Sequence, residues 1–183
     1  MINIAILGFG VVGSGVAEVI STNAAELAER LDGEQPNIKH ILDLRTFPEH
    51  PLGDRVTADF DIILNDEDVF LVVETMGGSH PAYEFSKKAL LAGKNVVTSN
   101  KEVVANYGAE LLEIARENGV SYLFEASVGG GIPIIRPMWQ CLAANRIQSV
   151  SGILNGTCNY ILTKMEREKS DFADALAEAQ RLG

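Results

Sequence analysis

The sequence predicts an α/β protein of the Rossmann type, a doubly wound parallel sheet, followed by the start of a second, α+β domain. Over the first 125 residues, short β-branched apolar runs alternate about five times with helical patterns. The first run, residues 2–7, is almost continuously apolar, as in a parallel strand that is buried on both faces. Right-handed crossovers between such strands follow from this order.

The turn after the first predicted strand consists of Gly8, Phe9, Gly10, Val11, Val12 and Gly13. Its glycines have the spacing G-x-G-x-x-G: Gly8 permits a tight turn, Gly10 lets the backbone approach a pyrophosphate, and Gly13 lets the helix pack on the strand. N–H groups at the start of the helix would then point at phosphate. Strand, turn and helix in this order predict a dinucleotide site; a tight turn without a ligand is the alternative.

The second predicted strand, residues 38–44, follows a helix over residues 11–32. Asp43 lies at its end, where an acidic residue accepts hydrogen bonds from the adenosine ribose hydroxyls. Arg45, two residues further on, could instead pair with a 2′-phosphate or be a solvated loop arginine. NAD and NADP therefore both stay open.

The chain continues through a loop rich in proline and charge to three more predicted strands. The loop covers residues 46–57, the strands 69–74, 95–98 and 120–124, and the helices between them 82–92 and 102–118. Thr75 begins a turn of small residues at the carboxyl end of a strand, which is where such folds bind ligands.

Lys101 is the candidate catalytic residue. It follows Ser99 and Asn100 after the strand at residues 95–98, near the expected position of a nicotinamide ring. An ammonium group there can polarise a carbonyl oxygen and stabilise the alkoxide that develops on hydride transfer. A lysine with its head in water is the alternative, which the positive end of the following helix disfavours.

Glu125 begins a glycine-rich stretch after the last predicted strand. Its carboxylate and neighbouring carbonyl oxygens could bind a hard cation; otherwise it is a capping carboxylate. Beyond it we expect a helix over residues 134–144, a strand over residues 149–154, and helices over residues 155–169 and 172–183. One strand and these helices cannot close a sheet, so this part is an incomplete domain.

The composition excludes several classes of partner. A net charge of −10 argues against nucleic acid and anionic membranes. No apolar run reaches the roughly 18 residues of a membrane span, and the N-terminus has no secretory pattern. The two cysteines, Cys141 and Cys158, lie in predicted helices without metal-ligand spacing. We expect free core thiols and a cytoplasmic protein.

Together, five segments resemble homoserine dehydrogenase, and the resemblance covers all 183 residues. The segments are residues 8–13, 73–78, 98–101 and, most specifically, 124–135 (Phe-Glu-Ala-Ser-Val-Gly-Gly-Gly-Ile-Pro-Ile-Ile) and 151–163 (Ser-Gly-Ile-Leu-Asn-Gly-Thr-Cys-Asn-Tyr-Ile-Leu-Thr). This family reduces L-aspartate 4-semialdehyde to L-homoserine with NADPH or NADH, on the route to threonine and methionine.

The resemblance implies coenzyme contacts at residues 9–12, Thr75, Ser99, Lys101 and Gly183. It also implies a sodium ion bound by the Glu125 side chain and the backbone carbonyls of Val128, Gly130 and Ile132. Residues 155–157 would lead into a substrate domain whose sheet builds the subunit interface of a homodimer or homotetramer.

One departure from the family bears on activity. The family's substrate-binding carboxylates and its proton-donating lysine follow a Leu-Gly pair, which here is Leu182-Gly183. The sequence does not contain that segment. We therefore expect a fragment with little or no dehydrogenase activity, made of an NAD(P)-binding domain (residues 1–130) and the beginning of a substrate and dimerisation domain (residues 131–183).

Two other functions compete with this interpretation. A non-catalytic, redox-sensing nucleotide-binding module would use the same fold, but it has no need of residues 124–135 and 155–163. Another semialdehyde dehydrogenase is the second alternative. Cys141 and Cys158 argue against the phosphorylating kind, because neither follows a predicted strand end as a nucleophile would.

Overall fold

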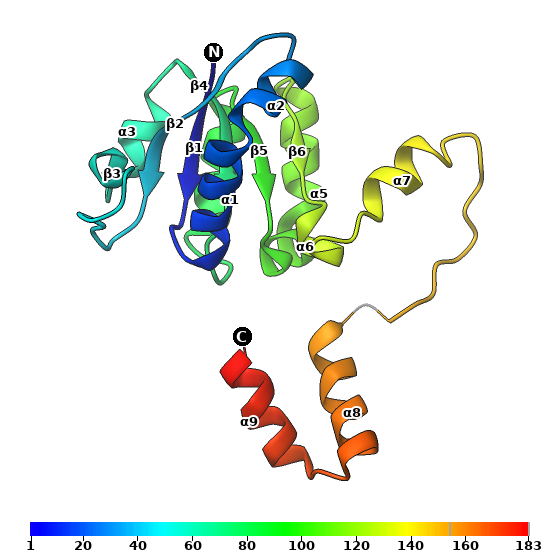
Figure 1. Ribbon diagram of the computed structural model, residues 1–183. Helices are drawn as coiled ribbons and strands as arrows, with labels where there is room; N and C mark the ends of the chain where they lie inside the picture. Colours follow the sequence, from blue (N-terminus) through cyan, green and yellow to red (C-terminus); the bar gives the residue numbers. More distant parts are fainter. Residues whose placement is uncertain (154, 183) are drawn as a thin grey trace. The chain divides into compact units, whose positions relative to one another are not determined.

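A computed structural model describes residues 1–153 and 155–182 and contains two compact units, Met1–Arg136 and Pro137–Gly183. The first unit holds one parallel six-stranded sheet, in the order β3-β2-β1-β4-β5-β6 (Figure 1). Its strands are β1 (Ile2–Leu7), β2 (Pro36–Leu42), β3 (Val56–Thr57), β4 (Val69–Glu74), β5 (Asn95–Thr98) and β6 (Tyr122–Leu123). This order, which reverses between β1 and β4, is typical of dinucleotide-binding folds. The predicted Rossmann-type sheet is confirmed.

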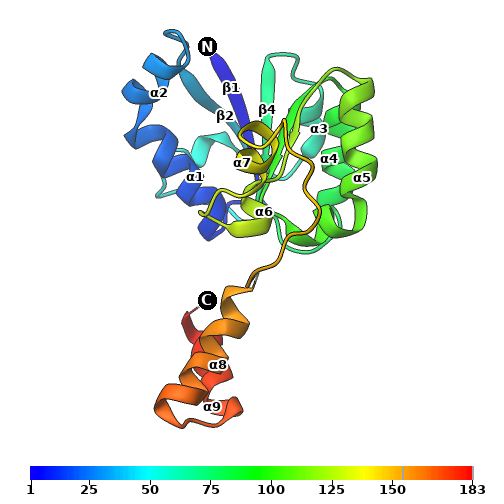
Figure 2. The ribbon, with the colours of Figure 1, turned by 90° about the vertical axis from the view of Figure 1, so that its right-hand side faces the viewer.

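Alternating side chains of β1 supply two hydrophobic cores, one on each face of the sheet. Ile4 and Ile6 face the core beneath the first helices, whereas Ala5 and Leu7 face the core beneath the later ones. The first group of helices is α1 (Val11–Thr22) and α2 (Ala24–Arg30); the second is α3 (Phe60–Leu64), α4 (Ala82–Leu91) and α5 (Lys101–Glu117). Figure 2 shows these two groups on opposite sides of the sheet.

Two predictions about the first unit need correction. The helix over residues 11–32 is broken at Asn23, whose N–H bonds to the Val19 carbonyl and closes α1. The loop over residues 46–57 contains a short 3-10 helix, Gly53–Arg55, and the strand β3. That strand is only two residues long and is fixed by pairing with β2, so no sequence period reveals it.

The sequence also misplaced elements after β6. A short helix, α6 (Ala126–Gly129), was not predicted, and α7 (Ile135–Gln140) ends earlier than expected. Residues 149–153 do not form the predicted strand; Leu154, its last residue, lies outside the described residues. A strand needs a partner strand for its backbone hydrogen bonds. The described residues of the second unit contain no strand that could pair with this segment.

The second unit contains two packed helices, α8 (Gly156–Glu168) and α9 (Phe172–Leu182). Their core is Ile161, Ala175 and Ala179. Asp171 caps α9, since its Oδ1 accepts a hydrogen bond from the Asp174 N–H at 2.9 Å.

Cys141 and Cys158 are exposed rather than buried as core thiols. Cys141 follows α7, and Cys158 lies in the first turn of α8, so neither side chain enters a core. In the part of the chain that the structure describes, no helix combines the length and the apolar character that crossing a membrane requires.

Candidate dinucleotide site

The carboxyl ends of the parallel strands lie at one edge of the sheet, and the predicted site residues follow these ends. Gly8 follows β1, Thr75 follows β4, and Ser99 follows β5. Asp43 follows β2, and Glu125 comes shortly after β6. Residues far apart in the sequence are thereby brought to one edge, which is where folds of this type bind ligands.

Each of the three positions in the turn has a glycine for a different structural reason. Gly8 has a φ of +89°, a left-handed conformation that favours glycine. A Cβ on Gly13 would lie 2.0 Å from the Gly8 carbonyl oxygen, so α1 can pack here only without a side chain. A Cβ on Gly10 would meet no atom within 4 Å. Folding therefore requires Gly8 and Gly13, whereas Gly10 leaves open backbone that a ligand can approach.

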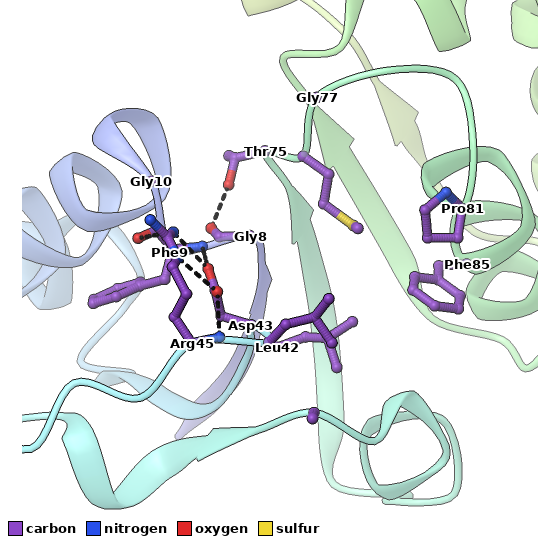
Figure 3. A pocket seen from close by; sticks show the side chains of 13 residues that line it. Gly8, Phe9, Gly10, Leu42, Asp43, Arg45, Thr75, Gly77, Pro81 and Phe85 are labelled. Atoms are coloured by element: carbon purple, nitrogen blue, oxygen red, sulfur yellow. Dashed lines mark hydrogen bonds and ion pairs between the residues drawn. The ribbon is translucent and has the colours of Figure 1, made fainter.

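Thr75 holds the glycine turn against β4. Its N–H bonds to the Leu7 carbonyl at 2.9 Å. Its hydroxyl lies 3.0 Å from the Leu7 carbonyl oxygen and 2.8 Å from that of Gly8, the contact drawn in Figure 3. The hydroxyl has one proton to donate and two acceptors within reach. Thr75 therefore fixes the position of the turn as well as lining the site.

Asp43 and Arg45 form one bonded unit with the backbone of Phe9 (Figure 3). Asp43 Oδ2 accepts the Phe9 N–H at 2.8 Å and Arg45 Nη2 at 2.9 Å, and Oδ1 accepts Arg45 Nε at 3.0 Å. Arg45 Nη2 also donates to the Phe9 carbonyl at 3.1 Å. The Asp43 side chain is 9% exposed and that of Arg45 is 63% exposed.

These contacts set the charge state of Asp43. The guanidinium of Arg45, helped by the N–H groups of Arg45 and Phe9, holds the pKa of Asp43 well below its ordinary value. The carboxylate is therefore ionised at neutral pH, but much of its hydrogen-bonding capacity is already in use. The two residues that pointed to different coenzymes in the sequence are thus paired with each other.

The Phe9 side chain joins the glycine turn to the loop before β3. Its ring is buried and meets the rings of Phe47 and His50 edge-on, at centroid distances of 5.1 and 5.0 Å. The Arg45 guanidinium lies over the Phe47 ring, 5.2 Å from its centroid. Sequence reasoning missed this aromatic cluster, because Phe47 and His50 come from an irregular loop.

A cavity of about 550 Å³ opens beside the turn, within the range of small-molecule sites. Gly8, Phe9, Gly10, Asp43, Arg45 and Thr75 line it, together with the apolar or small residues Leu42, Leu44, Ala58, Met76, Gly77, Pro81 and Phe85. Sequence reasoning missed most of this second group. Ala58 reaches the cavity only because β3 pairs with β2, and Phe85 lies on α4, beyond the small-residue turn.

Val11, Val12, Ser99 and Lys101 do not line this cavity. Val11 and Val12 form the exposed first turn of α1. The Ser99 N–H bonds to the Glu74 carbonyl at 3.1 Å, and Lys101 is the exposed first residue of α5. Within the described ranges the Lys101 ammonium makes no ion pair, so it is free to meet a ligand at this edge.

Glu125 serves as a capping carboxylate in this structure. Its Oε1 accepts the N–H groups of Ile134 and Ile135 at 2.5 and 2.8 Å, and Oε2 accepts that of Arg136 at 2.7 Å. These N–H groups, that of Ile134 first, lower the pKa of Glu125. These N–H groups lie at the start of α7 and have no carbonyl partner within the helix. By accepting them, the carboxylate stabilises that helix.

The remaining predicted ligands of a cation lie around α6. Val128 belongs to α6, Gly130 follows it with a φ of +59°, and Ile132 is exposed. No cluster of three or more His, Cys, Asp or Glu side chains suited to a metal occurs among the described residues. Gly183, the last predicted coenzyme contact, lies outside the described residues.

Comparison with known proteins identifies the family. Residues 8–125 match the family model described as the NAD binding domain of homoserine dehydrogenase, and residues 133–183 match the model described as homoserine dehydrogenase. The chain belongs to the homoserine dehydrogenase family. These matches cover four of the segments that carried the sequence resemblance, residues 8–13, 73–78, 98–101 and 151–163, and the two ends of the fifth, residues 124–135.

Individual relatives agree with this assignment. Homoserine dehydrogenase of Synechocystis sp. is 42% identical over 184 residues, covering 100% of this chain and 42% of the relative. The crystal structure of a homoserine dehydrogenase from Thiobacillus denitrificans superposes with a TM-score of 0.90 at 40% identity, covering 100% of this chain and 42% of that one. A hyperthermophilic archaeal homoserine dehydrogenase in complex with NADPH gives a TM-score of 0.84 at 30% identity, covering 100% and 61%. The chain thus spans about two fifths of the length of the curated relatives.

The glycine turn allows a prediction that separates folding from binding. Gly13→Ala should lower the free energy of unfolding by about 2–3 kcal/mol, because its Cβ would collide with the Gly8 carbonyl. Gly10→Ala should lower it by no more than about 1 kcal/mol but weaken NADPH binding at least about tenfold, because its Cβ would occupy the ligand's approach. Urea unfolding and isothermal titration calorimetry measure the two effects.

Gly15→Ala is the matched control, since it lies in α1 and its Cβ would also meet no atom within 4 Å. It should raise stability slightly, through better helix propensity, and leave NADPH binding unchanged. Normal NADPH binding by Gly10→Ala would contradict the assignment of this turn to the pyrophosphate.

Proposed function

We propose that this chain forms the coenzyme-binding part of an NAD(P)-dependent homoserine dehydrogenase, which interconverts L-aspartate 4-semialdehyde and L-homoserine. The observation that carries the proposal is the shared sheet edge: the glycine turn, Asp43 and Lys101 follow the carboxyl ends of β1, β2 and β5 in a chain of this family. A non-catalytic redox sensor is not favoured, because the family match extends through residues 133–183.

The residues present suit a dinucleotide. The open backbone at Gly10 and the first N–H groups of α1, at Val11, Val12 and Gly13, would hold the pyrophosphate. The cavity bounded by Leu42, Leu44, Ala58 and Pro81 offers apolar walls for the adenine, with Asp43 beside the ribose. NADP or NAD, when bound, supplies or accepts the hydride.

Lys101 would act on the reacting oxygen. Its ammonium would donate a hydrogen bond to the aldehyde carbonyl and stabilise the alkoxide as negative charge develops there. The start of α5 adds a positive field, because the N-terminal end of a helix is the positive end of its dipole. In the reverse direction the same contact would stabilise the homoserine alkoxide from which the hydride leaves.

The assay that tests this proposal measures homoserine-dependent reduction of NADP and NAD. We expect activity in the longest polypeptide that the gene encodes, loss of most of it on Lys101→Ala, and little or none in the 183-residue chain. Coenzyme reduction by that polypeptide with other hydroxy amino acids but not with homoserine would contradict the substrate. Full turnover by the 183-residue chain would show that it needs no further residues for proton transfer.

We further propose that both NADP and NAD bind. Arg45 is largely exposed and can turn toward a 2′-phosphate while Asp43 keeps the Phe9 N–H. With NAD, the Asp43 carboxylate would accept hydrogen bonds from the ribose hydroxyls and share its oxygens with Arg45. The NADPH complex of an archaeal relative supports the first case.

Arg45→Ala should therefore change coenzyme preference. Removing the guanidinium takes away the phosphate partner, so NADPH affinity should fall about tenfold, whereas NADH affinity should stay or rise because Asp43 oxygens are released. Titration calorimetry with both coenzymes measures the ratio. Arg116→Ala, which breaks another surface Arg–carboxylate pair on α5, should leave it unchanged. An equal loss of both affinities would contradict this role.

A sodium ion at Glu125 is a further proposal. A carboxylate offers about four lone-pair positions, and three are used by N–H groups here. Within the described part of the chain, the carbonyls of Gly130 and Ile132 accept no hydrogen bond, so oxygen donors remain for a hard cation. Val128 would contribute its carbonyl as well.

The sodium proposal predicts a cation-specific effect. Raising NaCl should increase the unfolding temperature of the chain more than KCl or choline chloride does at equal ionic strength, and Glu125→Gln should abolish the difference. Glu113→Gln, which removes an exposed carboxylate on α5, is the control. Identical responses to the three salts would contradict the site.

The remaining features of the proposal concern the whole protein. We propose that residues 131–183 begin the substrate and dimerisation domain, after an NAD(P)-binding domain over residues 1–130. The whole protein would be a cytoplasmic homodimer or homotetramer with a small-molecule substrate and no nucleic-acid or membrane partner. The family match over residues 133–183 supports the domain assignment, and the strongly negative charge argues against nucleic-acid and anionic-membrane partners.

A further inference from the structure

Glu74 is a fully buried carboxylate at the carboxyl end of β4, directly before Thr75. Its relative exposure is 0%, and its neighbours on the same face of the sheet are apolar side chains such as Val72 and Val96. It cannot touch a coenzyme or substrate, because no part of it reaches the surface. The proposed function does not account for it.

Three donors surround the Glu74 carboxylate. Oε2 accepts the Thr98 hydroxyl at 2.5 Å, and Oε1 accepts the Met76 N–H at 2.7 Å. The side-chain amide of Asn100 lies farther away, at 3.5 Å from Oε1. The Thr98 hydroxyl and the Met76 N–H are the close donors, one to each oxygen, and this arrangement suits a carboxylate that accepts at both oxygens.

The contacts continue from Glu74 to the residue before Lys101. The Thr98 hydroxyl, which donates to Glu74, accepts the Asn100 N–H at 2.9 Å. Asn100 then caps α5, since its Oδ1 accepts the N–H groups of Glu102 and Val103 at 3.1 and 3.2 Å. The chain of hydrogen bonds therefore ends at the first turn of the helix that Lys101 begins.

The same network ties the loop after β4 to the loop after β5. The Asn100 side-chain amide donates to the carbonyls of Met76 and Gly78, at 3.2 and 2.7 Å. Glu74 fixes the Met76 N–H on one side and Thr98 on the other. One buried group thus sets the spacing of two loops that carry predicted coenzyme contacts.

Core stability does not explain this carboxylate. Burial raises the pKa of Glu74, which means that the environment disfavours its charge. Removing an ion from water is costly, and an apolar side chain of similar volume often fills such a place with no loss of stability. The Glu74 carboxylate is better explained by the two loops that it positions.

We propose that Glu74 is a positioning residue that holds Thr75, Ser99 and Lys101 in the geometry needed for coenzyme binding and hydride transfer. The effect on coenzyme binding and hydride transfer rests on the proposed function, whereas the hydrogen bonds of Glu74 do not depend on it. Glu74 acts through Met76, Thr98 and Asn100 and does not touch the coenzyme.

The test compares binding with stability in the 183-residue chain. Glu74→Gln keeps the size but cannot accept both the Thr98 hydroxyl and the Met76 N–H in the same way. It should weaken NADPH binding about tenfold in titration calorimetry while the unfolding temperature stays equal or rises. Thr98→Val should weaken NADPH binding by a similar factor, the double variant should bind no more weakly than either single variant, and Thr98→Ser should bind normally.

Tyr122→Phe is the matched control. Tyr122 is buried on the same side of the sheet, and within the described residues its hydroxyl has no hydrogen-bond partner. Its loss should leave NADPH binding unchanged. Normal binding by Glu74→Gln, or a loss that only follows a lower unfolding temperature, would overturn the proposal.

Hydrogen exchange gives a readout that does not depend on coenzyme. Glu74→Gln should speed exchange of the amides of Met76, Asn100 and Val103, while amides in the middle of β1 keep wild-type rates. If wild-type chain fails to bind NADPH, the proposed function fails, yet this pattern still decides the role of Glu74. Unchanged exchange at these amides would overturn it.

Discussion

The close approach of α1 to the end of β1 is the constraint on which the site depends. It requires Gly13 to have no Cβ, because the Gly8 carbonyl lies where that atom would be. Thr75 then bonds to the same carbonyl from β4, so β1, β4 and α1 meet at one point. This contact places the N–H groups of α1 at the sheet edge and leaves Gly10 open beside them. The cavity and the paired Asp43 and Arg45 are arranged around it.

Three carboxylates organise the rest of that edge, each by accepting backbone N–H groups. Asp43 after β2 holds Phe9, Glu74 at the end of β4 holds Met76, and Glu125 beyond β6 holds the start of α7. Loops at a sheet edge have unbonded N–H groups, and an ionised carboxylate is their strongest acceptor. Carboxylates in these places therefore stabilise loop geometry, in a chain whose proposed ligand is itself an anion.

Some parts of the fold could be predicted because their signals are local. β1, β4 and β5 lie inside the sheet with helices on both faces, so their runs are largely apolar, and the glycine spacing follows from the contact of α1 with β1. β3 and the expected strand over residues 149–154 depend instead on a partner strand. The first has β2 beside it and forms with only two residues; the second has no such partner among the described residues.

The sequence by itself determined the alternation of the longer strands and helices in the first unit, the glycine turn, and the residues that stand at strand ends, because these depend on neighbours within one turn or strand. It could not decide between two roles for Arg45 or for Glu125. The Asp43 carboxylate that Arg45 meets is also held by Phe9 from far along the chain, and the donors to Glu125 lie across a loop. Tertiary structure paired Arg45 with Asp43 and aimed Glu125 at the start of α7. It alone linked Glu74 to Thr98 and Asn100, because parallel pairing of β4 with β5 brings those residues together.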